Sequence, residues 1–289
     1  MKCYHQNVLT AAILVVVGLL TGCATSLTNM SQARVLEAGD AQATMGYQLD
    51  LHSQSFSSLI EVGKAAYEHI DEGEGEITEE TFRRGLDTIL LYKLFPLGGS
   101  PEVIGRVGIY DDLLHGVDVG IRYNGTVIKG DVRVQLWESA DRALALTAQL
   151  GYGHHRSVAP GAVEWLTLTK WNRKDFDLGL SMGWELPDIF KAYVVPRLVI
   201  SRISTEPKLS SKILDRLPEG LLDFAEFFPA TNMYYMGANT GFMVGYKYVF
   251  VNFDLSLFRI NFEPLVLGSR RDYGGWGVSP TLGLTGHWY

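Results

Sequence analysis

The sequence predicts an all-β protein, an antiparallel transmembrane β-barrel of about 12 strands, with about ten strands as the alternative. Three observations predict this fold. Many segments alternate apolar and polar residues, as strands with one apolar and one wet face do. Several of these segments run for about 9 to 12 residues, the length that crosses a bilayer at a tilt. The Trp residues lie in these segments, mostly near their ends, as in the aromatic girdles of membrane barrels: Trp137, Trp165, Trp171, Trp184, Trp276 and Trp288.

The composition fits a barrel better than a helical membrane protein. The chain has 289 residues with 31 Gly and an aromatic share of 11%, and its mean hydropathy is only +0.06. A barrel places its apolar residues at every second position, so its average hydropathy stays low. The net charge of -7 argues against a nucleic-acid partner, because phosphate binding needs a basic surface.

The first residues are typical of a secretory signal peptide. Lys2 supplies one positive charge, and residues 8–20 form an apolar run that is too short for a transmembrane helix. Leu20-Thr21-Gly22-Cys23 follows directly and resembles the lipobox of bacterial lipoproteins, which are cleaved before the Cys. The resemblance implies a lipoprotein signal peptide over residues 1–22.

The same resemblance implies how the mature chain is anchored. In bacterial lipoproteins acyl chains are attached to the Cys, so the expected cofactor is a covalent lipid at Cys23 and no other. Ala24 follows where an Asp would favour the inner membrane, which favours the outer membrane here. Cys3 would leave with the signal peptide, so no disulfide is expected. Residues 23–40 are expected to form a lipidated N-terminal tether.

The barrel is expected over residues 41–289. Residues 41–52 alternate without interruption, with Tyr47 and Leu49 on one face and Gln48 on the other. Comparable strand patterns recur further along the chain, at about residues 103–110, 117–123, 132–136, 144–152, 162–171, 176–185, 193–204, 233–246, 249–262 and 274–289. A twelfth strand is placed in residues 87–97, which are apolar but do not alternate. Equally, two of the segments joined into one strand give ten.

Two insertions are predicted to be helical. Residues 56–84 space Leu59, Val62 and Ala66 as one helix face does, and residues 209–228 show similar spacing. Such helices cap the barrel mouth, plug the lumen, dock a partner or simply pack as loop helices. The sequence leaves these alternatives open.

The polar phase of the strands predicts a lined lumen. Charged residues of both signs share this phase and face the interior in a membrane barrel. The predicted lumen-lining residues are Arg106, Asp118, Arg122, Asp131, Arg133, Asp177, Arg197 and Asp254. Open aqueous channels belong to barrels of about 16 strands and upward, so a barrel of about ten to 12 strands is expected to be narrow or plugged.

The barrel pattern as a whole resembles bacterial outer-membrane β-barrel proteins. The matching stretches are residues 33–40, which lead into the first strand, residues 109–122, and the C-terminal residues 281–289. In that class the barrel-assembly machinery reads an aromatic C-terminal strand, here ending at Trp288 and Tyr289. The resemblance implies outer-membrane lipids, this machinery and an envelope protein as partners.

Little in the sequence indicates catalysis. His154 and Ser157 are the nearest candidates for lipid hydrolysis, yet no third member accompanies them. The acidic run at residues 71–76 lacks the spacing of a calcium loop, and no metal site is expected. We therefore predict a non-enzymatic, lipid-anchored barrel with a structural or partner-binding role in the cell envelope. A small-solute transporter or narrow channel is the first alternative, and a membrane-embedded lipid-modifying enzyme is the second.

Overall fold

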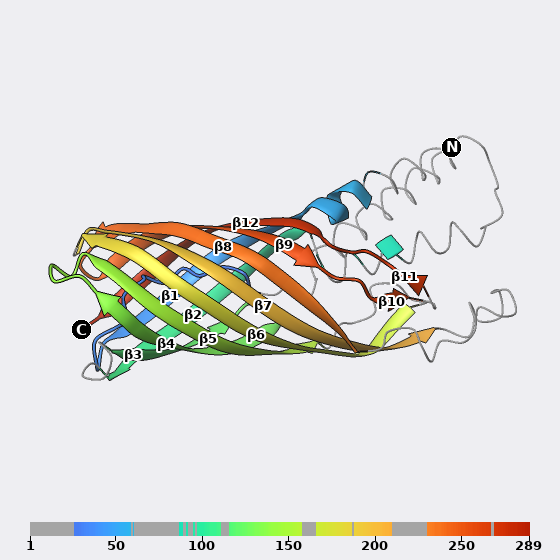
Figure 1. Cartoon of the computed structure of the whole chain (residues 1–289), viewed down its shortest axis with the longest axis horizontal. Coiled ribbons are helices and arrows are strands. Elements are labelled where there is room, and N and C mark those ends of the chain that lie inside the picture. The colour runs from blue at the N-terminus through green and yellow to red at the C-terminus, as the bar shows by residue number, and fades with distance from the viewer. Residues whose placement is uncertain are drawn as a thin grey trace, which may run out of the picture.

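Ten antiparallel strands close into one barrel in the computed structural model of the chain (Figure 1). Around the barrel the strands follow the order β1-β12-β9-β8-β7-β6-β5-β4-β3-β2, so chain neighbours pair with each other and β12 closes on β1. The structure describes residues 26–58, 60, 87–88, 91, 95, 97–110, 116–157, 166–186, 188–209, 230–266 and 269–289. The predicted closed antiparallel barrel is confirmed.

The strands are long, as the alternation predicted. The barrel strands are β1 (Ala41–His52), β2 (Gly98–Tyr110), β3 (Val117–Tyr123), β4 (Val127–Glu138), β5 (Leu144–Ser157), β6 (Leu166–Leu186), β7 (Phe190–Leu209), β8 (Thr231–Tyr246), β9 (Val249–Asn261) and β12 (Gly275–Trp288). Two further strands, β10 (Leu265–Val266) and β11 (Ser269–Arg270), form a separate two-stranded sheet beside the barrel.

The preferred count of 12 strands is wrong, and the alternative of ten is confirmed. The predicted segments at residues 162–171 and 176–185 overlap one continuous strand, β6, which pairs with β7 from Leu166 to Leu186. The predicted twelfth strand is not one in the part of residues 87–97 that the structure describes before β2. Residues 87–88 and 91 are helical there, which suits an apolar run that does not alternate.

The two helical insertions are only partly visible. The helix after β1 occupies residues 53–58 and 60 in the described part of the chain, and most of residues 56–84 lies outside it. The second insertion, residues 209–228, lies outside the described residues except for Leu209, which ends β7. No helix in the part of the chain that the structure describes is long and apolar enough to cross a membrane.

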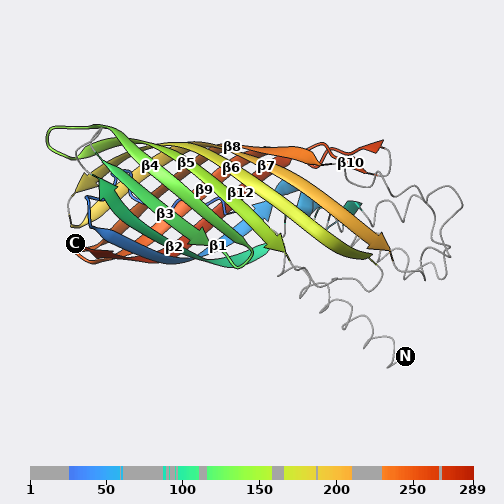
Figure 2. The same ribbon diagram turned by 90° about the horizontal axis from the view of Figure 1, so that it is seen from below.

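The two ends of the barrel differ in their connections (Figures 1 and 2). At one end the strands are joined by residues 111–116, 139–143, 187–189 and 247–248, and the C-terminus lies there. At the other end the connections are residues 53–97, 124–126, 158–165, 210–230 and 262–274. We call these the short-turn end and the long-loop end. In outer-membrane barrels the short turns are periplasmic and the longer loops extracellular.

Successive side chains point alternately out of the barrel and into it. On β12, Leu282 and Leu284 are about three-fifths exposed on the exterior, whereas the neighbouring Thr281 and Thr285 are buried inside. Aromatic residues lie on the exterior near both ends, with Trp137, Trp184, Tyr246 and Trp288 toward the short turns and Tyr123, Tyr152, Tyr234 and Trp276 toward the long loops. The exterior is thus an apolar wall between two aromatic belts, and the interior is largely polar, with inward-facing apolar side chains such as Val199, Ile203 and Phe258 among the charges.

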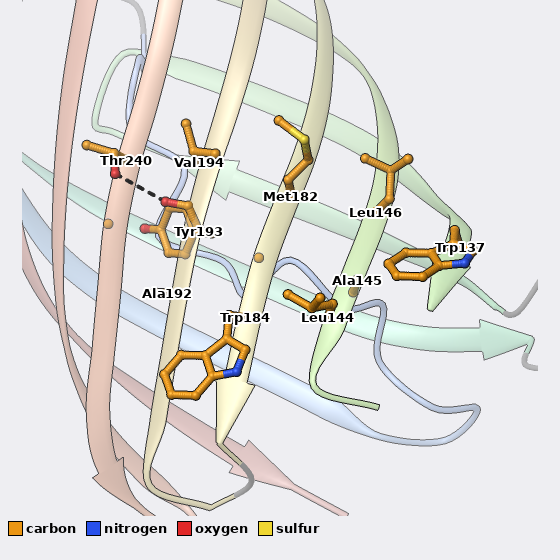
Figure 3. A pocket seen from close by; sticks show the side chains of 12 residues that line it. Trp137, Leu144, Ala145, Leu146, Met182, Trp184, Ala192, Tyr193, Val194 and Thr240 are labelled. Carbon is orange, nitrogen blue, oxygen red and sulfur yellow. Dashed lines mark hydrogen bonds between the residues drawn. The ribbon is translucent and has the colours of Figure 1, made fainter. Parts of the chain in front are cut away.

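A shallow depression of about 560 Å³ interrupts this wall near the short-turn end. Figure 3 shows it on the faces of β4 to β8, with Trp137 on one side, Trp184 nearest the short turns, and Met182 and Val194 farther along their strands. Gly183 and Gly241, which have no side chain, help to line it. The depression opens on the apolar exterior, and inward-facing residues of the wall such as Gly183 and Tyr193 also line it.

Candidate functional site in the barrel lumen

All the residues predicted to line the lumen are buried in the interior of the barrel. Each is buried, at 5% exposure or less, and together they come from β2, β3, β4, β6, β7 and β9: Arg106, Asp118, Arg122, Asp131, Arg133, Asp177, Arg197 and Asp254. The strand register brings several of them side by side, because Asp118 pairs with Arg133 across β3 and β4. Residues far apart in the sequence therefore form connected networks.

The largest network is centred on Asp118. Its carboxylate accepts from Arg106 Nη1 at 2.5 Å, and from Arg133 Nε at 3.0 Å and Nη2 at 2.5 Å. Arg106 also bonds Asp131, and Arg122 Nη2 lies 3.9 Å from the second oxygen of Asp131. Charge-assisted pairs of this kind are retained in a buried site only when each charge has a partner. The network ties the adjacent strands β2, β3 and β4 together on the inner face of the wall.

A second network joins β4, β6 and β7. Asp177 accepts from Arg197 Nε at 2.7 Å and also bonds the Lys129 ammonium. Lys129 was not among the predicted lumen residues, although it shares the alternation phase of Asp131 two positions later. The phase itself could have identified it.

A third network lies nearer the long-loop end, and none of its residues was among the predicted lumen residues. Arg173 donates to Asp175 at 2.9 Å, to the Ser201 hydroxyl at 2.9 Å and to the Tyr235 hydroxyl at 3.0 Å. His155 Nε2 lies 3.2 Å from the other oxygen of Asp175. Asp175 and Arg173 fall on the same phase as Asp177, so the period of two was sufficient to find them.

A segment of the chain itself fills the centre of the lumen. Residues 26–36, which we call the plug, are buried at all positions except Arg34, which is half-buried. The plug is the blue trace that runs inside the barrel toward β1 in Figures 1 and 2. Residues 37–39, which follow it, are exposed at the short-turn end. The stretch predicted as a polar tether therefore lies largely inside the barrel.

The lumen recognises the plug chiefly through its backbone. The Leu27 carbonyl accepts from Arg197 Nη1 and Asn239 Nδ2, both at 2.6 Å. The Gln32 carbonyl accepts from Arg133 Nη1 at 2.5 Å. Backbone groups buried away from water have to be paired, and a chain outside a sheet has no ladder to pair them. The lumen side chains supply those partners instead.

Acceptors in the lumen bind the N–H groups at the end of the plug. The Leu36 N–H donates to Asp118 Oδ2 and the Val35 N–H to Gln135 Oε1, each at 3.0 Å. Asp118 thus binds two guanidinium groups and one backbone N–H. The plug and the charged network form one structure, since removal of either leaves buried groups of the other without partners.

Glycines on the inner face make room for the plug. A methyl group at Gly46 would lie 2.7 Å from the sulfur of Met30, and one at Gly283 would lie 2.9 Å from it. A methyl group at Gly183 would lie 2.3 Å from the Ala33 side chain. These three positions account for part of the high Gly content of the chain. Their lack of a side chain is used for close packing against the plug.

Gly108 is the position where a substitution is expected to disturb the chain that leaves the plug, residues 37–40. Its N–H and carbonyl are hydrogen-bonded to Asp40 and Gly39, and a methyl group there would lie 1.9 Å from the Glu37 carbonyl oxygen. Gly108→Ala is expected to displace residues 37–40 and to lower the free energy of unfolding by about 1–3 kcal/mol. Urea titration of the reconstituted barrel measures this change. Gly105→Ala on the outer face of the same strand is the control, since its methyl group would meet nothing closer than 3.8 Å. Equal stability of the two variants would contradict the prediction.

The remaining candidates from the sequence are His154, Ser157, Cys23 and the acidic run at residues 71–76. His154 is exposed on the outer face, whereas the neighbouring His155 is buried inside, so the two imidazoles point to opposite sides of the wall. Cys23 and residues 71–76 lie outside the described residues, and the side chain of Ser157 is likewise not described. Within the described ranges, no three His, Cys, Asp or Glu side chains are placed together to hold a metal ion.

Comparison with known proteins adds two distant similarities in structure. No protein-family model matches the chain, and no curated protein matches it. Ail, the attachment invasion locus protein of Yersinia pestis, aligns with 87% of this chain and 99% of its own at 5% identity, with a TM-score of 0.32. Neisserial surface protein A (NspA) aligns with 86% of this chain and 95% of its own at 11% identity, with a TM-score of 0.31. The strand pairing and the apolar exterior are by themselves those of an outer-membrane type of β-barrel.

Proposed function

We propose that this protein is a lipid-anchored barrel of the bacterial outer membrane with a structural or partner-binding role in the cell envelope and no enzymatic activity. The observation that carries the proposal is the closed lumen. Residues 26–36 occupy its centre, and the charges around them are paired with one another and with the plug. A barrel closed in this way serves as a scaffold and presents its loops.

The exterior supports a position in a membrane. Side chains such as Leu150, Leu257 and Val251 are about half-exposed or more on the barrel wall. Soluble proteins rarely expose one contiguous apolar surface of this extent. Aromatic belts at both ends match the two interfaces of a bilayer. Outer-membrane lipids are thus the partners proposed for the wall.

The features at the two ends of the barrel support two different proposed partners. The C-terminal strand β12 closes the barrel against β1 and carries Trp288 on its outer face and His287 inside. Its aromatic end is the feature proposed for recognition by the barrel-assembly machinery. The long connections are the feature proposed for an envelope or surface partner, because binding residues concentrate on loops held by a rigid scaffold.

The fold and the anchor are tested together in membrane fractions. An unboiled sample is expected to migrate faster in electrophoresis than a boiled one, because the closed barrel stays compact until heated. Metabolic labelling with a palmitate analogue is expected to mark the natural chain, and Cys23→Ala is expected to abolish the label while keeping the heat-dependent migration. Identical migration before and after boiling, or a label that survives the Cys23→Ala change, contradicts the corresponding part of the proposal.

A further inference from the structure

The plug runs through the barrel in one direction. Its C-terminal end leaves at the short-turn end, where residues 37–39 are exposed and the Gly39 N–H donates to the Gly108 carbonyl at 3.1 Å. Its N-terminal end lies far deeper, since the Ser26 hydroxyl donates to the Glu102 carboxylate and is buried. Ser26, the first residue of the plug, therefore lies on the long-loop side of the lumen.

The depth of Ser26 in the lumen follows from the position of its partner Glu102 on β2. Glu102 stands eight residues before Tyr110, the last residue of β2 at the short-turn end. Eight residues at about 3.3 Å each, on a strand tilted by about 40°, cover about 20 Å along the barrel axis. The next residue, Val103, pairs with Tyr123, the last residue of β3. Glu102 is thus level with the rim that the β3–β4 turn forms at the long-loop end.

Chain length limits where Cys23 can be. It lies outside the described residues, but it stands only three positions before Ser26, and three steps along the chain span at most about 11 Å. A chain that turned back would also have to share the lumen with residues 27–36, which already fill it. Cys23 therefore cannot reach the short-turn end, about 20 Å from Ser26, while the plug is in place.

An acyl chain does not remain in this lumen. The side chains nearest Ser26 are charged and polar, among them Glu102, Arg122 and Asn239. The inward-facing apolar side chains toward the long-loop end, such as Phe258 and Ile260, are already buried by their neighbours, and acyl chains gain free energy only in an apolar environment. An exposed apolar surface lies on the exterior at the same rim, where Ile121 and Ile128 are exposed. A lipid on Cys23 reaches it by leaving at the long-loop end.

We propose that the mature chain is threaded through its own barrel, with its N-terminus and the lipid of Cys23 at the long-loop end, in the outer leaflet of the membrane. This inference rests on the proposed function for the acylation of Cys23 and for the orientation of the barrel. It reverses the tether expected from the sequence. The anchor and the C-terminus lie on opposite sides of the membrane, and residues 26–36 run through the barrel between them.

Epitope accessibility on intact cells tests the threading. A flexible segment that carries an epitope is inserted between Cys23 and Ala24, and the matched control carries the same segment after Ala38, which is exposed at the short-turn end. The first epitope is expected to bind antibody on intact cells, and the control epitope only after the outer membrane is permeabilised. Palmitate-analogue labelling and heat-dependent migration are measured on both variants.

The outcomes separate this inference from the proposed function. A labelled, heat-modifiable variant whose Cys23-adjacent epitope is detected only after permeabilisation, or not at all until the protein is denatured, overturns the threading and leaves the anchored barrel standing. An epitope detected on intact cells without palmitate labelling supports the threading and contradicts the acylation. Detection of the control epitope on intact cells reverses the assigned ends and overturns the proposed leaflet.

Discussion

A variant that lacks residues 26–36 is expected to conduct ions across planar lipid bilayers, whereas the full chain is expected to remain silent. Barrels of eight strands have an interior that side chains just fill, and barrels of 16 or more enclose aqueous channels. With ten strands, space remains at the centre, and the plug occupies it. The deletion leaves that space to water and frees guanidinium groups that now bind the plug, such as those of Arg133 and Arg197.

The opened lumen is expected to select weakly between cations and anions. Among the buried residues of the barrel strands that the structure describes, the two signs are equal in number. Seven carry positive charge, namely Arg106, Arg122, Lys129, Arg133, Arg173, Lys191 and Arg197, and seven carry negative charge, namely Glu102, Asp118, Asp131, Asp175, Asp177, Glu185 and Asp254. Reversal potentials close to zero in a KCl gradient check this expectation. The conductance is expected to be well below that of a 16-strand porin.

A synthetic peptide with the sequence of residues 26–36 is the control for this experiment. It is expected to block the current of the deletion variant, because the lumen binds the plug through non-covalent contacts to its backbone. A peptide of the same composition in scrambled order keeps the backbone but misplaces Met30 and Ala33 relative to the glycines of the wall, so it is expected to block less well. A folded, heat-modifiable deletion variant that carries no current would show that the wall side chains close the lumen without the plug.

The fold could be predicted from the sequence because its signal is local. Each strand shows a period of two on its own, and β9 alternates over its whole length between buried positions and exposed or half-buried ones. The number of strands was harder to predict from the sequence, because the boundary between two strands depends on where a turn forms. Residues 166–186 contain polar residues at 172–174 that resemble a turn, yet they continue as one strand because β5 and β7 pair with both halves.

The plug could not be predicted from local patterns. Residues 26–36 neither alternate nor repeat at helical spacing, and they precede the first strand as a linker would. Their partners are Arg122, Arg133, Arg197, Asn239 and Gln135, which lie about 100 to 210 residues further along the chain. The sequence did indicate that the arginines inside the barrel need further hydrogen-bond partners. Arginines on the inner face of a narrow barrel need acceptors, and the acids of that face alone do not use all their N–H groups.

Asp118→Ala is expected to cost the most stability of any single change in the lumen, about 3–5 kcal/mol, because it leaves buried charges without their partner. The carboxylate binds Arg106 and Arg133 and also accepts from the Leu36 N–H at 3.0 Å, so its loss affects both the wall and the plug. Urea titration of the barrel in lipid vesicles measures the free energy of unfolding. The temperature at which the compact form disappears on gels gives a second readout.

Glu37→Ala provides the matched control for Asp118→Ala. Glu37 is also an acid that pairs with an arginine, and it directly follows the plug, but its partner Arg142 is exposed and lies 2.9 Å away at the short-turn end. Exposed pairs contribute about 0–1 kcal/mol, because water solvates both charges once they separate. The two acids therefore differ mainly in burial. If Asp118→Ala were no more destabilising than Glu37→Ala, water would have to reach the Arg106 and Arg133 guanidinium groups, and the lumen would not be closed at this level.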